Sequence, residues 1–157
     1  MKSLCVAAIL LVSTYAYAQE YSIDLMRQDI KAMKVELMTS SLPLTQQQAD
    51  LFWPLYRDYS NELSKLADRR FAVAKEIVAK YDTMDAKTAD RLAKESFKIA
   101  EGRNTLLEKY YKKISKAVGA VTASRFLQVE VQMLTLLDTQ LMNEVPLIKN
   151  KAAGKAK

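Results

Sequence analysis

Apolar residues recur at helical spacing over most of the chain, and the longest run starts soon after residue 46. They fall three, four or seven residues apart as far as a break after Tyr81, at positions Phe52, Leu55, Tyr59, Leu63, Leu66, Val73, Ile77 and Tyr81. This spacing places them on one face of an α-helix. A helix over residues 46–81 would be about 54 Å long at about 1.5 Å per residue. Such a helix predicts an elongated hairpin or bundle.

Three further stretches show the same period. Residues 22–41 have a stripe of Ile23, Met26, Ile30, Met33 and Leu37, with Ser22 as the expected N-cap. A third helix is expected from a cap at Asp85 to about Val118, with Gly119 as a left-handed stop. A fourth is expected from a cap at Thr122 to about Glu144. It is apolar on much of its circumference, so it must be buried or paired.

These patterns predict an all-α fold: an elongated antiparallel helical hairpin or bundle of about four helices, with long second and third helices. The second helix has a clear start, because Thr45 and Gln48 match the capping box. In this motif the side chain of the cap residue accepts a hydrogen bond from the backbone of the third helical residue, and the side chain of that residue accepts one from the backbone of the cap. Pro54 lies inside this helix, where a proline removes a backbone hydrogen bond. We expect a kink beside Phe52 and Trp53; the alternative is a bend that shapes a concave functional face.

The N-terminus has the layout of a secretory signal peptide. Lys2 precedes an apolar run over residues 6–12, and Ala16-Tyr17-Ala18 matches a cleavage site. The alternative, a membrane anchor, would need about 20 apolar residues, and the run is too short. We therefore expect residues 1–18 to be removed after Ala18, export to the periplasm, and a single helical domain over residues 19–148.

Charge and composition exclude several functions. The net charge is +6, but much of the excess lies in a Lys-rich tail over residues 149–157, which we expect to be flexible. Basic and acidic residues nearly balance in the domain itself, which argues against a nucleic-acid-binding face. The tail could still make weak electrostatic contact with anionic lipid.

The chain also lacks the residues that most catalytic and metal sites use. It has no histidine, and its single cysteine, Cys5, lies in the expected signal peptide. We therefore expect no catalytic, cofactor or metal site, and no enzyme activity. The methionines of the first helix could form a soft-metal face, but packing is the simpler role. Glu130, Asp138 and Glu144 lie on the fourth helix without the Glu-x-x-His pattern of di-iron bundles, and the carboxylates are expected at exposed positions.

Two groups of residues are candidates for contacts with other proteins. The first is a basic, aromatic surface near the end of the third helix, formed by Lys109, Tyr110, Tyr111, Lys112 and Lys113. Its lysines also favour the helix dipole, which would be a purely structural role. The second is the apolar fourth helix, where Leu134 and Leu137 are expected in a dimer interface or in the core.

Short motifs resemble those of one protein family. Leu44, Thr45 and Gln48 form an L-T-x-x-Q pattern that resembles the motif of the Spy/CpxP-like family of periplasmic helical proteins. Residues 52–59, Phe-Trp-Pro-x-Tyr-x-x-Tyr, and residues 144–147, Glu-Val-Pro-Leu, resemble an uncharacterised branch of this group. The family often repeats its motif near the fourth helix, where this chain has Val-Thr-Ala-Ser-Arg over residues 121–125.

The resemblance implies an exported, protein-binding helical protein, such as an ATP-independent chaperone that binds unfolded or envelope proteins as a homodimer. The alternative is a regulatory or sensor protein of envelope stress signalling that docks on a membrane partner. A third class is a structural envelope component that binds lipid through its Lys-rich tail.

Overall fold

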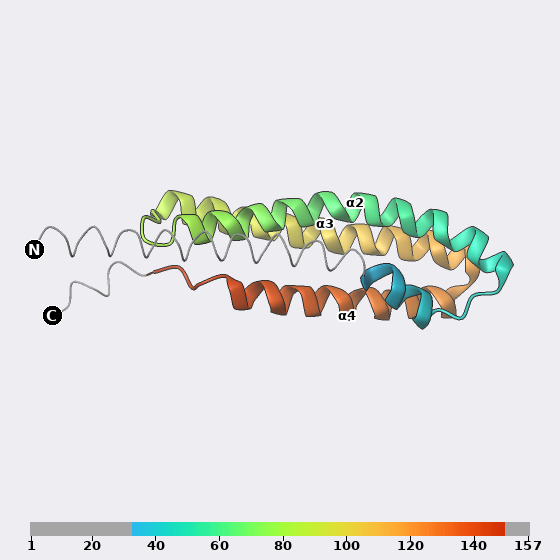
Figure 1. Cartoon of the computed structure of the whole chain (residues 1–157). Helices are drawn as coiled ribbons and strands as arrows, with labels where there is room; N and C mark the ends of the chain where they lie inside the picture. Colours follow the sequence, from blue (N-terminus) through green and yellow to red (C-terminus); the bar gives the residue numbers. More distant parts are fainter. Residues whose placement is uncertain (1–32, 150–157) are drawn as a thin grey trace, which may run out of the picture.

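The computed structural model describes residues 33–149, which form helices joined by short turns. A short helical segment over residues 33–41 is followed by α2 (Gln46–Ala79), α3 (Ala86–Val118) and α4 (Ala120–Glu144). The long helices α2 and α3 lie side by side and antiparallel, and α4 returns along them (Figure 1). No strand occurs within this described region. The predicted all-α, elongated architecture with long second and third helices is therefore confirmed.

The start of α2 is the capping box that the sequence predicts. Thr45 Oγ1 accepts a hydrogen bond from the backbone N–H of Gln48, and the Gln48 side chain accepts one from the backbone N–H of Thr45. The helix continues through Pro54 and ends at Ala79, two residues before the predicted end. Trp53 is partly buried and meets the ring of Phe52 edge-on at 5.1 Å. These contacts support a packing role for this stretch.

The junction between α3 and α4 differs in detail from the prediction. Asp85 caps α3 as expected, and Gly119 ends it. The φ of Gly119 is 92° and its ψ is 154°, a region that is essentially restricted to glycine but is not the left-handed helical one. Because this one residue reverses the chain, α4 begins at once at Ala120. The prediction that Thr122 caps the fourth helix is therefore wrong.

The core is divided into two clusters. The main cluster takes buried residues from the segment 33–41, from α2, α3 and the first half of α4; its most buried members include Met38, Phe52, Tyr59, Tyr110, Ile114 and Phe126. The second cluster is small and consists of Phe71, Ala74 and Leu141. The inward stripe of α2 is slightly rotated from the predicted one, since Tyr56 and Phe71 are buried whereas Leu55 and Val73 are only partly buried.

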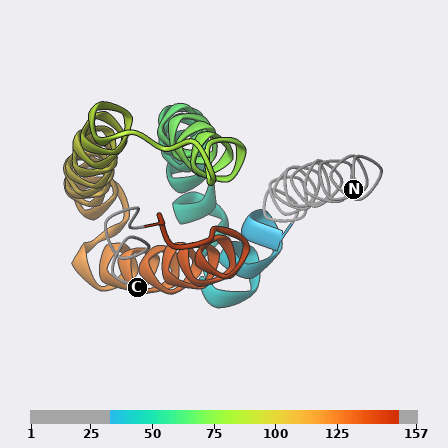
Figure 2. The same cartoon turned by 90° about the vertical axis from the view of Figure 1, so that its left-hand side faces the viewer.

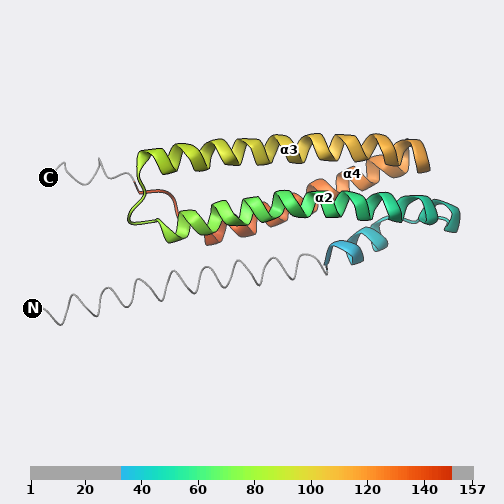
Figure 3. The same cartoon turned by 90° about the horizontal axis from the view of Figure 1, so that it is seen from above.

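The two ends of the bundle differ in how many helices they contain. Seen from above, the segment 33–41 lies beside the first half of α2 only (Figure 3). Seen along its length, α2, α3 and α4 form three sides of the bundle (Figure 2). The helices α2 and α3 approach closely at Gly102, where an added Cβ would lie 3.2 Å from Leu66 Cδ2. The described residues thus form a four-helix arrangement at one end and a three-helix arrangement at the other.

Candidate functional site

A buried carboxylate lies at the centre of the main core. Glu130 of α4 has no exposed surface, and its oxygens accept hydrogen bonds from the Tyr56 hydroxyl at 3.2 Å and the Tyr59 hydroxyl at 3.1 Å. Lys34 Nζ lies 3.2 Å from both carboxylate oxygens. The expectation that the carboxylates lie at exposed positions is therefore wrong for Glu130. The four residues, called the Glu130 cluster below, join the segment 33–41 and α2 to α4.

The electrostatics of the Glu130 cluster keep its phenols protonated. Burial, and next the negative charge of Glu130, raise the pKa of Tyr56 above the ordinary value for tyrosine. The same two causes raise the pKa of Tyr59. The Lys34 ammonium lies 5.6 Å from the centre of the Tyr59 ring and supplies the compensating charge. Because each phenol donates to the carboxylate and the ammonium pairs with it, this arrangement is a structural ion pair.

Next to this cluster lies a cavity of about 310 Å³, called the central cavity below. It separates the two core clusters, and its walls come from the segment 33–41, α2, α3 and α4: Lys34, Val35, Tyr56, Ser60, Asn61, Leu63, Ser64, Leu66, Ala67, Asp68, Arg70, Phe71, Ile99, Arg103, Met133, Leu134 and Leu137. Val35, Asn61 and Asp68 are exposed, so the cavity reaches the surface. Its volume is at the lower end of the range of about 300–1,000 Å³ for ligand pockets.

Two arginines and an aspartate form one polar wall of the central cavity. Arg103 pairs with the carboxylate of Asp138 through both terminal nitrogens, at 3.1 and 2.9 Å. Arg70 Nε lies 3.0 Å from Asp138 Oδ1, but the geometry does not make a hydrogen bond, and this buried nitrogen has no other partner among the described residues. The cavity thus combines apolar walls with a guanidinium group whose Nε is not satisfied.

The predicted basic, aromatic surface on α3 is largely paired within the protein. Tyr110 is 1 % exposed, and its hydroxyl donates to Glu62 Oε1 at 2.8 Å. Lys109 also binds Glu62, at 2.8 Å, and Lys113 Nζ lies 4.7 Å from the centre of the Tyr110 ring. Burial and the hydrogen bond to Glu62 raise the pKa of Tyr110 to about 12.

The remaining members of that surface add little exposed aromatic area. Lys112 pairs with Glu108 one turn away on α3, and Tyr111 is partly buried against the main cluster. The prediction of an aromatic contact surface is therefore corrected at Tyr110, which belongs to the core. Lys109 and Tyr110 tie α3 to α2 through Glu62.

The residues of the L-T-x-x-Q pattern have structural contacts. Leu44 is partly buried against the main cluster, and Thr45 and Gln48 form the cap of α2. Gln48 Nε2 also donates to the backbone oxygen of Val118 at 3.4 Å. The motif therefore connects the start of α2 to the end of α3.

Leu134 and Leu137 both face the interior. Leu134 is 9 % exposed and belongs to the main cluster, whereas Leu137 packs against the small one. Both line the central cavity. Of the two predicted roles, the structure places them in the core; the exposed large apolar residues of α4 are Val121, Val131, Leu136 and Met142.

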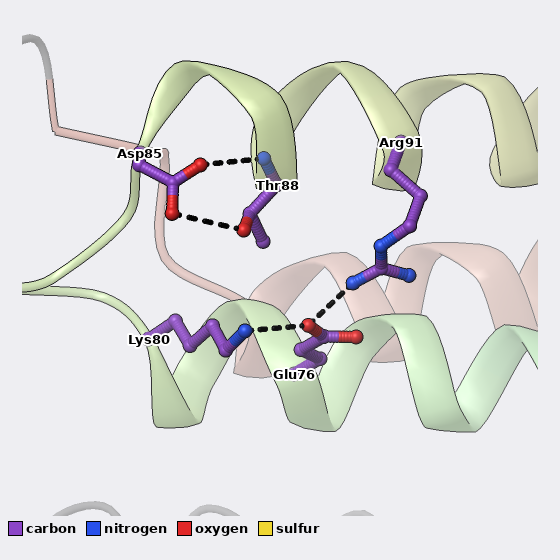
Figure 4. A network of polar contacts seen from close by, with 5 residues as sticks. All are labelled: Glu76, Lys80, Asp85, Thr88 and Arg91. Carbon is purple, nitrogen blue, oxygen red and sulfur yellow. Dashed lines mark hydrogen bonds and ion pairs between the residues drawn. The ribbon is translucent and has the colours of Figure 1, made fainter.

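Polar contacts hold the turn between α2 and α3 at the opposite end of the molecule (Figure 4). The carboxylate of Asp85 accepts hydrogen bonds from the backbone N–H of Thr88 at 2.7 Å and from its hydroxyl at 3.2 Å. Glu76 pairs with Lys80 at 3.0 Å and with Arg91 of α3. The hydrogen bond from Arg91, followed by that from Lys80, lowers the pKa of Glu76. This network fixes the hairpin between α2 and α3.

Most of the predictions about the termini concern residues outside the described part of the chain. Residues 1–32, with the expected signal peptide and most of the first predicted helix, are not described, nor are residues 150–157 of the expected tail. Lys149 is described: it pairs with Asp82, and its Nζ lies 4.3 Å from the centre of the Tyr81 ring.

Between residues 33 and 149, no helix is long and apolar enough to cross a bilayer. The same residues contain no group of three His, Cys, Asp or Glu side chains that could hold a metal ion. The structure is thus an elongated α-helical bundle, and the central cavity lies between its long helices. No protein-family model, curated protein or solved structure matches this chain.

Proposed function

We propose that this protein is an exported, periplasmic binding protein for other polypeptides, and that it holds apolar segments of unfolded proteins without ATP, as the resemblance to Spy/CpxP-like proteins implies. The observation that carries the proposal is the central cavity, which reaches the surface between long helices and is walled mainly by apolar side chains. Grooves of this kind accept the apolar face of an amphipathic helix. The occupant we propose is such a segment of an unfolded client.

The composition of the cavity supports this occupant. Leu134 and Leu137 of α4 and Phe71 of α2 offer apolar surface for side chains spaced one turn apart. Arg70 also lies at the wall, where it pairs with Asp138. Such a surface recognises apolar character and helical spacing and would accept many sequences, which is what a chaperone requires.

The test is light scattering of an aggregating client protein in the presence of the purified mature chain. We expect equimolar protein to suppress aggregation, and we expect Ala67→Phe, which fills the cavity, to reduce suppression. Ala72→Phe is the matched control, because Ala72 is exposed on the same helix and does not line the cavity. Absence of suppression by the unmodified protein would exclude the chaperone function.

A further inference from the structure

The lining of the central cavity is divided into an apolar floor and a charged rim. Apart from Tyr56, the buried residues of the lining are purely apolar: Leu63, Phe71, Ile99 and Leu134. The charged residues of the lining keep part of their surface exposed. Among them Arg70 and Arg103 lie together, with side chains 30 % and 22 % exposed. Apolar walls with a few convergent polar groups are the usual composition of a small-molecule site.

The rim beside Asp138 carries an excess of positive charge. Arg103 and Arg70 lie 2.9 and 3.0 Å from the Asp138 carboxylate, so two guanidinium groups share one carboxylate. The contact from Arg70 Nε does not have the geometry of a hydrogen bond. A guanidinium group carries several N–H donors in a planar fork that matches a carboxylate. A second carboxylate, supplied by a ligand, would therefore balance the charge of the two arginines.

The other charged residues of the wall do not provide that balance. Lys34 is matched by the buried Glu130, at 3.2 Å. Asp68 is exposed and lies two residues before Arg70 on α2, and side chains at this spacing do not face each other on a helix. The excess positive charge of the cavity is therefore located at Arg70 and Arg103.

The dimensions of the cavity fit one hydrocarbon chain. The residues of α2 that line it run from Tyr56 to Phe71, which is a rise of about 22 Å at about 1.5 Å per residue. The hydrocarbon core of a bilayer is about 30 Å thick and holds two chains end to end, so one chain extends about 15 Å. The volume of about 310 Å³ is at the lower end of the range for ligand pockets, which favours one chain over the paired chains of a phospholipid.

We propose that the central cavity binds a single-chain amphiphile with a carboxylate head group, of the class of long-chain fatty acids. The acyl chain lies on the apolar floor, and the carboxylate accepts hydrogen bonds from Arg70 at the rim. Ligand binding of this kind does not depend on the chaperone function, because it needs no client. A bound acyl chain and a client segment exclude each other, since both occupy the same cavity.

Isothermal titration calorimetry of the purified mature chain with sodium dodecanoate, below its micelle concentration, tests the site. We expect saturable binding of one dodecanoate per chain. Dodecanol, which has the same chain without the charge, should bind about tenfold more weakly, because it lacks the charged hydrogen bonds. Ala67→Phe, which fills the cavity, should abolish binding of dodecanoate. Ala72→Phe, at an exposed position outside the cavity, should leave it unchanged.

Arg70→Gln tests the contact with the head group. It should weaken dodecanoate binding about tenfold and leave dodecanol binding unchanged, because only the carboxylate loses its charged donor. Arg69→Gln is the matched control, since Arg69 is the preceding residue of α2, pairs with Glu95 and does not line the cavity. Circular dichroism of each variant shows whether its helices are intact.

Two sets of results would overturn the proposal. Absence of dodecanoate binding, or binding that a folded Ala67→Phe variant retains, would exclude the cavity as the site. Equal affinity for dodecanoate and dodecanol, or equal weakening by the two arginine variants, would exclude recognition of the carboxylate. If Ala67→Phe does not fold, the dodecanol comparison and Arg70→Gln still decide the proposal. Failure to suppress client aggregation would exclude the chaperone function and leave these binding results unaffected.

Discussion

At the scale of single residues, the buried carboxylate of Glu130 has a large effect on the free energy of folding. Removing a carboxylate from water costs several kcal/mol unless nearby donors and a counter-charge compensate for the lost hydration. Two tyrosine hydroxyls and the Lys34 ammonium supply that compensation, and they come from parts of the chain that are distant in sequence. The cluster therefore fixes how the segment 33–41 and α2 sit on α4.

We predict that Glu130→Ala lowers the free energy of unfolding by about 3–5 kcal/mol, because it leaves the Lys34 ammonium and two buried hydroxyls without their acceptor. Urea denaturation followed by circular dichroism measures the change. Glu101→Ala, at an exposed position on α3, should stay within about 0.5 kcal/mol of the unmodified protein. A similar loss in both variants would show that the Glu130 cluster has no special role.

Because three tyrosines are buried, we also expect the fold to lose stability at alkaline pH. The pKa of Tyr110 is raised from 10.0 to about 12 in the folded protein, and burial likewise raises the pKa of Tyr56 and Tyr59. A group whose folded-state pKa is raised stabilises the fold fully below its unfolded pKa, here 10.0. That contribution is lost as the pH rises through about 12.

We therefore expect unfolding above pH 10, with these tyrosines ionising together as the helices melt. Ultraviolet absorbance of tyrosinate and circular dichroism should change in the same step. Tyr59→Phe should make the absorbance step smaller. Gradual ionisation of all tyrosines near their ordinary pKa, with the helices intact, would contradict the burial seen here.

At the scale of elements, Gly119 determines where α3 ends and α4 begins. Its φ of 92° and ψ of 154° are accessible to glycine but strained for other residues. We predict that Gly119→Ala lowers the free energy of unfolding by about 1–3 kcal/mol, although nothing lies within 4 Å of the added Cβ. Thermal unfolding measures the effect.

Gly102→Ala is the control for that prediction. Gly102 lies inside α3, where alanine is favoured over glycine by about 1 kcal/mol. The added Cβ would press on Leu66 Cδ2 at 3.2 Å, the mobile end of a side chain. The two effects oppose each other, so this change should be nearly neutral. Equal destabilisation by both alanines would mean that backbone strain at Gly119 is unimportant.

At the scale of the whole molecule, the expected homodimer needs a different surface from the one the sequence indicates. Leu134 and Leu137 face the interior, so they cannot form a seam between two intact subunits. Val131 and Met142 are exposed and lie eleven residues, about three turns, apart on the outer face of α4. We propose this face for the symmetric interface of the expected homodimer.

We predict that Val131→Asp with Met142→Asp dissociates the dimer and leaves the helices folded, because the charges enter an exposed surface. Leu134→Asp with Leu137→Asp should instead unfold the protein, since it buries unpaired charge in the core. Analytical ultracentrifugation and circular dichroism distinguish the two results. If the unmodified mature chain sediments as a monomer, the dimer is excluded.

The sequence alone determined the long helices and most of their ends, because local patterns control where helices start and stop; the start of α4 at Ala120 was missed. The Thr45–Gln48 box, the Asp85 cap and the glycine at 119 each act within a few residues, and the stripe beginning at Phe52 shows the length of α2. The spacing of the fourth helix also indicated that Glu130 faces inward, since it lies four residues from each of Phe126 and Leu134, which are buried.

Only the tertiary structure decided what the inward faces meet. Whether Glu130 is hydrated or paired depends on Lys34, Tyr56 and Tyr59, which lie from 71 to 96 residues away along the chain. Tyr110 was expected on a contact surface, but it is buried and its hydroxyl donates a hydrogen bond to Glu62 of the neighbouring helix. The central cavity also depends on tertiary structure, because its walls come from the segment 33–41 and from α2, α3 and α4. Periodicity gives the direction of each side chain about its own helix axis, but the position of the neighbouring helix determines its partner.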